Sequence, residues 1–126
     1  MKDKTIELFS EADKKFMDRL QLLGMSRKAA GVFTYLLQRE SGSSRMIEIT
    51  SGLRQPEVSI GIQEISTWIT ITPVAPDNGG RQRKTLYYSL AVPWKEVVRH
   101  YYQESCAEFD KVQAAFTELV DLDAPI

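Results

Sequence analysis

The feature that most constrains this chain is a glycine and a proline four residues apart, between two short apolar segments. In the run Ser51-Gly52-Leu53-Arg54-Gln55-Pro56-Glu57-Val58-Ser59, Gly52 can end one helix. Pro56 fits the first turn of the next helix, where a missing amide costs nothing. Glu57 suits the positive end of that helix. A short helix, a tight turn and a second helix are the parts of a helix-turn-helix.

Apolar spacing places the two helices of this unit. Ser43 or Ser44 can cap a short helix that contains Met46, Ile47 and Ile49. After the turn, apolar residues recur at steps of four, three and four and are expected to face the core: Val58, Ile62, Ile65 and Ile69. We expect this second helix over about residues 55–68, with its opposite face turned outward.

Two further helices are predicted upstream. From Lys2 to Leu23 one apolar stripe predicts a helix, formed by Ile6, Phe9, Phe16, Leu20 and Leu23. Gly24 follows where a left-handed cap is needed. Ser26 starts the next helix, which closes at Ser41-Gly42-Ser43 and has an inner face of Ala29, Ala30, Phe33, Leu36 and Leu37.

After Trp68 the apolar period shortens to two, which is typical of strands. Residues 70–74 and 85–90 are predicted to be two strands of a β-hairpin. The connection is rich in turn residues and carries three cations, Arg81, Arg83 and Lys84. A hairpin with a basic tip that follows a helix-turn-helix is called a wing, here residues 73–84.

The final segment is predicted to be a long helix from Pro93 onward. Its apolar residues follow a strict heptad spacing in which Ser105 is the one polar member: Val98, Tyr102, Ser105, Phe109, Val112, Phe116 and Leu119. This stripe can pack on a second subunit, on the N-terminal helix of the same chain, or on both. We expect a homodimer interface made of Phe9, Phe16, Val98, Tyr102, Phe109, Val112, Phe116 and Leu119.

The predicted fold is therefore mainly α with a small β-hairpin (α+β). The 126 residues, 43% of them hydrophobic, suit one compact unit with flanking helices, which we divide into 1–23, 24–92 and 93–126. No apolar stretch is long enough to span a membrane, and the opening lacks the apolar block of a secretory signal, so we expect a cytoplasmic protein. One cysteine and one histidine do not make a Cys/His zinc site, and no cofactor is expected.

The net charge of −1 conceals a gradient along the chain. Residues 1–23 are neutral, residues 24–99 carry ten basic and six acidic groups for a net +4, and residues 100–126 sum to −5. A polyanion would therefore meet the middle of the chain and be repelled by its end.

The nine-residue run around Gly52 and Pro56 resembles the turn and recognition-helix start of a group of predicted archaeal winged-helix transcriptional regulators, which belong with the MarR/TrmB-like proteins. The resemblance extends over about residues 20–105, through Trp68-Ile69, the basic wing and Tyr87-Tyr88-Ser89-Leu90. Many of these relatives have a charged stretch ending in Gly-Trp where this chain has Ser66-Thr67-Trp68. The resemblance implies a DNA-binding dimer that regulates transcription.

A reader of double-stranded DNA needs side chains that reach base edges and donors that hold phosphates. The outward face of the helix over 55–68 offers Gln55, Ser59, Ile60 and Gln63, next to Arg54 and Pro56 at its start. Glutamine can pair bidentately with adenine, and Ile60 can touch a thymine methyl group. The wing cations Arg81, Arg83 and Lys84 suit the backbone or the minor groove.

Two alternatives stay open. The near-neutral charge and the acidic C-terminal end favour a winged-helix module that binds proteins and not DNA, and an enzyme is disfavoured because no nucleophile–base pair or phosphate loop is visible. Aromatic residues around Trp94 can line a pocket for a small-molecule effector, although aromatic residues at helical spacing more often serve packing. Cys106 is expected to be a buried small packing residue, since nearby acidic residues disfavour the thiolate of a redox sensor, and His100 is expected at the surface.

Overall fold

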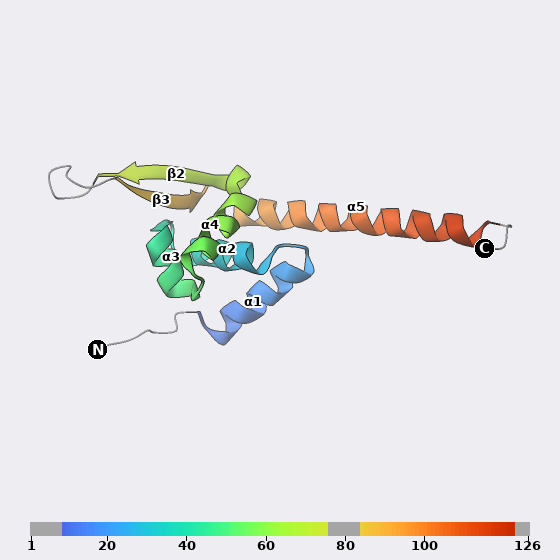
Figure 1. The fold of residues 1–126 in the computed structure, drawn as a ribbon, viewed down its shortest axis with the longest axis horizontal. Helices are drawn as coiled ribbons and strands as arrows, with labels where there is room; N and C mark the ends of the chain where they lie inside the picture. Colours follow the sequence, from blue (N-terminus) through green and yellow to red (C-terminus); the bar gives the residue numbers. More distant parts are fainter. Residues whose placement is uncertain (1–8, 76–83, 123–126) are drawn as a thin grey trace.

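The computed structural model describes residues 9–75 and 84–122 of the chain. Its elements follow in the order α1 (Glu11–Leu22), α2 (Arg27–Gln38), β1 (Gly42–Ser43), α3 (Ser44–Ser51), α4 (Gln55–Glu64), the 3-10 turn η1 (Ser66–Trp68), β2 (Ile69–Val74), β3 (Thr85–Leu90) and α5 (Trp94–Val120). Helices α1 to α4 form a helical body (Figure 1). The β2–β3 hairpin projects from one end of this body, and α5 leaves it in the opposite direction.

Helix α1 begins later than the sequence pattern predicts. Ser10 is its N-cap: the Ser10 hydroxyl accepts from the Asp13 amide at 3.1 Å, and the Asp13 carboxylate accepts from the Ser10 amide at 2.8 Å. This capping box fixes the helix start at Glu11. Phe9 therefore precedes the helix, yet it is only 4% exposed because it packs into the core. Ile6 and the rest of 1–8 lie outside the described residues.

Helix α2 is the centre of the core. Its N-cap is Ser26, as predicted, and all of residues 31–36 are buried. The predicted inner residues Ala29, Ala30, Phe33 and Leu36 are buried and Leu37 is half-buried. Helix α4 approaches α2 closely, since a Cβ on Gly61 would lie 2.6 Å from the Lys28 carbonyl oxygen. Glycine at 61 is what allows these two helices to touch through their backbones.

The helix-turn-helix is confirmed as α3 and α4. Ser43 caps α3, and Gly52 ends it with a φ of 80°, the left-handed conformation that glycine adopts at little cost. Pro56 lies in the first turn of α4. Val58 and Ile65 are fully buried, as the spacing predicts. Helix α4 is shorter than predicted, since it ends at Glu64 and Ile69 already belongs to β2.

The sheet has three strands in the order β1-β3-β2, one more than the predicted hairpin. Strands β2 and β3 pair antiparallel from Ile69 opposite Leu90 to Val74 opposite Thr85. The additional strand β1 is two residues long, with Gly42 opposite Tyr88. Its backbone passes directly under the Tyr35 ring, where a Cβ on Gly42 would collide. Strand β2 is one of the two outer strands and contains Pro73, which fits the rule that proline within a sheet occupies an edge.

Helix α5 is attached to the body through its first three turns only. Val97 is fully buried, and the Ser105 hydroxyl donates to the Leu23 carbonyl at 2.5 Å. From residue 107 to residue 122 every residue of the chain is exposed. The later members of the predicted heptad stripe are among the most exposed large apolar side chains: Phe109, Val112, Phe116 and Leu119. In the described part of the chain no helix has the length and apolar character needed to cross a membrane.

Candidate nucleic-acid interface

The outward face of α4 carries the side chains predicted to read DNA. Val58 and Ile62 hold the inner side of the helix against the core. At 100° per residue Gln63 lies toward the outer side of the helix, Ser59 on its flank, and Gln55 in line with Ile62 at the helix start, and all three are exposed. Ile60, 47% exposed, and Pro56 lie on the same outer side of the helix. The sequence prediction for this face is therefore consistent with the packing of α4.

A groove of about 280 Å³ separates α4 from the hairpin. Three of the predicted readers line it, together with residues from α3, η1 and both long strands: Ser44, Gln55, Ser59, Ile62, Gln63, Ser66, Ile71 and Tyr88. Arg54, Pro56 and Ile60 do not line the groove. Sequence reasoning missed Ser44, Ser66 and Tyr88, because they join α4 only through the tertiary fold and no local spacing marks them.

The α4 side chains that line this groove and are predicted to read DNA are available for contact with a ligand. Within the residues that the structure describes, the side chains of Gln55, Ser59 and Gln63 have no hydrogen-bond partner. Each glutamine presents one acceptor and two donors, and the serine presents a hydroxyl. A row of unsatisfied polar groups along an exposed helix suits a polar partner that supplies matching donors and acceptors.

The N-terminus of α4 already holds a carboxylate. Glu57 accepts from the Arg54 backbone amide at 2.9 Å and pairs with the Arg27 guanidinium at 2.9 Å. The bond from the Arg54 amide, opposed by desolvation and assisted by the Arg27 charge, holds the pKa of Glu57 below its ordinary value. The predicted preference of Glu57 for the positive helix end is confirmed. This helix end is therefore a poor anion site, and Arg27 is partly neutralised.

Only part of the wing can be placed. Lys84 is exposed at the start of β3, whereas Arg81 and Arg83 lie outside the described residues. Because side chains alternate along a strand, the register puts Ile71 and Pro73 on the same sheet face as Leu86 and Tyr88. Ile71 is 52% exposed and Leu86 43%, so the hairpin is apolar on the face that meets the α4 groove.

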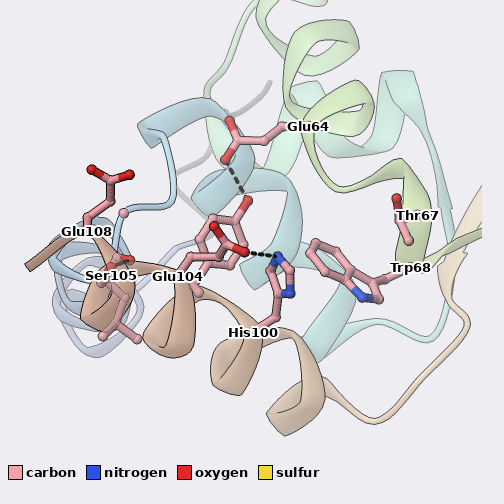
Figure 2. A pocket seen from close by; sticks show the side chains of 10 residues that line it. Glu64, Thr67, Trp68, His100, Glu104, Ser105 and Glu108 are labelled. Carbon is pink, nitrogen blue, oxygen red and sulfur yellow. Dashed lines mark hydrogen bonds and ion pairs between the residues drawn. The ribbon is translucent and has the colours of Figure 1, made fainter. Parts of the chain in front are cut away.

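A second cavity, of about 630 Å³, lies where α4 meets α5 (Figure 2). The Tyr101 hydroxyl donates to Glu64 at 2.7 Å, and the Ser26 amide donates to the same carboxylate oxygen at 3.1 Å. Burial raises the pKa of Glu64, but these hydrogen bonds outweigh it and leave that pKa below its ordinary value. Burial and the neighbouring Glu64 raise the pKa of Tyr101. The end of α4 is thereby tied to α5 and to the start of α2.

The same cavity shows where the junction aromatics lie. Trp68 meets His100 edge to face with ring centroids 5.0 Å apart, and His100 pairs with Glu104 at 4.0 Å. His100 is exposed, as predicted. Trp94 does not line this cavity but lies on the other side of α5, against Phe16. Cys106 is half-buried, less enclosed than the buried packing residue that the sequence predicts.

The predicted dimer residues of the N-terminal segment need a correction. Phe9 is 4% exposed in the single chain, so it packs into its own core and offers almost no surface to a partner. Phe16 is half-buried and contacts the Trp94 ring edge to face at 6.0 Å. The stripe on α1 is thus largely used within the chain, in contrast to the stripe on α5.

Comparisons with known proteins concern the fold. No protein-family model and no curated protein sequence matches the chain. Among solved structures, the chain is similar to a possible transcriptional regulator from Methanosarcina mazei Go1, with 12% identity over 88% of each chain and a TM-score of 0.55.

Two other solved structures resemble the chain less closely in shape. The YusO protein from Bacillus subtilis is 13% identical over 86% of this chain and 73% of its own, with a TM-score of 0.43. The transcriptional regulator PA3341 is 18% identical over 86% of this chain and 85% of its own, with a TM-score of 0.45.

These observations establish the fold. A helix-turn-helix of α3 and α4, followed directly by the β2–β3 hairpin and completed by β1, is an α+β winged-helix fold. The likeness to the Methanosarcina mazei protein over most of both chains agrees with this architecture.

Proposed function

We propose that this protein is a winged-helix transcriptional regulator that binds double-stranded DNA as a homodimer, with α4 as its recognition helix. The observation that carries the proposal is the row of exposed, unpartnered polar side chains on α4. Gln55, Ser59 and Gln63 form this row beside the hairpin. A helix of this width fits the major groove, where glutamine reads adenine by a bidentate pair.

Affinity for the DNA backbone is assigned to cations of the helix-turn-helix and of the wing. The amide end of α4 is occupied by Glu57, so phosphates are expected to meet the Arg54 guanidinium and the wing cations Arg81, Arg83 and Lys84. These contacts position the protein without reading sequence. The net +4 of residues 24–99 supports this assignment, because both the helix-turn-helix and the wing belong to that segment.

The dimer is assigned to the stripe on α5. Phe109 is 60% exposed and Phe116 67%, and rings this exposed along one helix face favour burial against a second copy. In a two-fold dimer two α4 helices would enter successive major grooves roughly 34 Å apart. The proposed binding site is therefore an inverted repeat.

A second function has one specific observation in its favour. The apolar side chains Ile71, Val74 and Leu86 are between 43% and 52% exposed on the hairpin, and Ile60 on α4 is 47% exposed. A wing of this kind also suits a protein partner, since interfaces bury apolar and aromatic side chains at their centre. Under this alternative the module would bind a protein and no DNA.

One experiment separates the two functions. The purified protein is used to select duplexes from a random library, and the enriched sequence is then titrated at several salt concentrations beside a scrambled duplex. The proposal expects an enriched inverted repeat that binds on the order of 10³-fold or more tightly than the scrambled sequence. If no duplex is enriched and none binds at low salt, DNA binding is overturned and the protein-binding function is favoured.

A further inference from the structure

The free half of α5 ends in a segment with a distinctive character. Phe116, Leu119 and Val120 are between 62% and 67% exposed on its last turns. The charged residues beside them, Glu118 and Asp121, are both acidic, and no basic residue occurs between 112 and 122. This end of the helix is therefore at once apolar and anionic.

The start of α5 carries the complementary surface. A groove of about 430 Å³ there is lined by Leu23, Trp94, Lys95, Val98, Arg99 and Tyr102. The Trp94 ring is held by Phe16 and lies under the Lys95 ammonium group, 5.8 Å from its centroid. The groove is thus apolar at its base, with two cations at its rim, and it continues into the heptad stripe at Val98 and Tyr102.

We infer that two copies of this chain pair through α5 in antiparallel orientation, so that the apolar, acidic end of each helix meets the part of the basic groove formed by Arg99 and Tyr102 of the other. This inference rests on the homodimer of the proposed function and adds its direction and its receiving site. Asp121 of one copy would then lie beside Arg99 of the other, with Glu118 roughly one helical turn away. A parallel pair would instead place like charges together at both ends, which opposes association.

The spacing of the stripe fits this direction. From residue 102 to residue 119 the steps are 3, 4, 3, 4 and 3, which read the same from either end. Reversed pairing matches Tyr102 with Leu119 and sets Ser105 opposite Phe116.

The position of the helical body points the same way. The body packs against one side of the first turns of α5, through buried Val97 and the Ser105–Leu23 hydrogen bond, and the free half extends away from it (Figure 1). In an antiparallel pair each free half runs along the start of the other helix, and the two bodies lie at opposite ends. A parallel pair would press the two bodies against each other.

Cysteine cross-linking tests the direction. In a Cys106→Ser background, chains carrying Tyr102→Cys and chains carrying Leu119→Cys are produced separately and together, then oxidised and identified by non-reducing electrophoresis and mass spectrometry. Both positions are exposed, at 57% and 67%, so neither change should disturb the fold, which circular dichroism checks. Antiparallel pairing predicts the mixed disulfide in co-produced chains and no self-linked product. In this arrangement two residues 102 would be about 25 Å apart, beyond the reach of a disulfide.

A charge reversal provides the second measurement. Arg99→Glu should weaken the dimer by on the order of tenfold, and adding Asp121→Lys should restore it. Sedimentation of the wild-type protein separates the possible failures. A dimer that forms self-linked products at both positions, or no cross-link at all, overturns the antiparallel seam and leaves the homodimer intact. A monomer at every concentration overturns the homodimer and this inference together, whereas loss of DNA binding affects neither result.

Discussion

The hydroxyl of Tyr101 on α5 donates a hydrogen bond of 2.7 Å to the carboxylate of Glu64, the last residue of α4. This bond joins the proposed recognition helix to the proposed dimerisation helix. Because the same carboxylate accepts from the Ser26 amide, the end of α4 is fixed from two sides. A rotation of α5 relative to the body would therefore act directly on α4.

The first prediction concerns the pH range of this bond. The lowered pKa of Glu64 means that its contribution to stability is present above the ordinary glutamate pKa and is lost as the pH falls through the folded-state pKa. The raised pKa of Tyr101 means that the contribution is also lost as the pH rises past the ordinary tyrosine pKa. Tyr101→Phe should lower the free energy of unfolding by about 1 kcal/mol at neutral pH, a modest figure because Glu64 is largely exposed.

Urea unfolding from about pH 3 to 10.5 measures this difference, which should be greatest between about pH 5 and 9. Tyr87→Phe is the matched control, because the Tyr87 hydroxyl has no hydrogen-bond partner within the described residues. A difference that is constant across the whole range would contradict the assigned bond.

The second prediction compares two glycines. Gly61→Ala should lower the free energy of unfolding by about 1–3 kcal/mol, because its Cβ would meet the Lys28 carbonyl of α2 and force the two helices apart. Gly52→Ala meets no atom within 4 Å and should cost about 1 kcal/mol through its φ of 80° alone. Gly52→Asn, which tolerates this conformation, should recover part of that loss, and Gly61→Asn should not. Thermal and urea unfolding measure all four variants.

The third prediction concerns sequence reading by Gln63. Gln63→Ala should weaken binding to the selected duplex by about 1–3 kcal/mol and change binding to a scrambled duplex little, because only the selected base edge loses its partner. Titrations at one fixed salt concentration decide this. Gln103→Ala, an equally exposed glutamine on α5, should change neither. Equal losses on both duplexes would show that Gln63 does not read bases.

The fourth prediction concerns the wing. Replacing Arg81, Arg83 and Lys84 by glutamine should weaken binding to all duplexes to a similar extent. It should also reduce the slope of log K against log salt by about 2–3, since each cation that pairs with a phosphate contributes about one. Titrations between low and moderate salt give the slope. A slope equal to that of the wild type would exclude contact between the wing and the DNA backbone.

The fifth prediction concerns assembly. Phe109→Asp would place a charge in the middle of the α5 stripe and should convert the dimer to monomers or aggregate, because an unpaired carboxylate is costly to bury. Since Phe109 is 60% exposed in the single chain, the fold of the monomer should survive. Sedimentation velocity at several concentrations measures the assembly. Gln103→Ala, again an exposed α5 residue away from the stripe, should leave it unchanged.

Local chemistry explains which parts of the fold could be predicted from the sequence. The caps Ser26 and Gly52, the proline of α4 and the two long strands each depend on residues close in sequence, and all were found where the patterns indicated. Strand β1 was missed because two residues carry no period and pair with Tyr87 and Tyr88 more than forty positions away. The early start predicted for α1 failed because the Ser10–Asp13 cap competes with a continuous apolar stripe.

The residues of the candidate site also separate into those that the local sequence pattern predicts and those that only the tertiary fold brings together. The outer position of Gln63 and the flanking position of Ser59 follow from helical geometry once Val58 and Ile62 face inward, whereas Gln55, in line with Ile62, is exposed at the start of the helix. The groove wall made by Ser44 and Tyr88, and the bond between Glu64 and Tyr101, depend on elements that meet only after folding. No spacing in the sequence distinguishes these residues from ordinary surface positions.

The proline in β2 has a consequence for how copies of this protein accumulate. An exposed edge strand can pair with a strand of another molecule, and repeated pairing of this kind leads to open-ended aggregation. Pro73 lacks the amide that an incoming strand would need, so the edge beside exposed Ile71 and Val74 is a poor template. Two helix faces related by a two-fold axis, in contrast, bury each other in one closed interface, to which no further copy can add. The proposed pairing through α5 would therefore close into a particle of fixed size, whereas Pro73 disfavours open-ended growth at the edge of the hairpin.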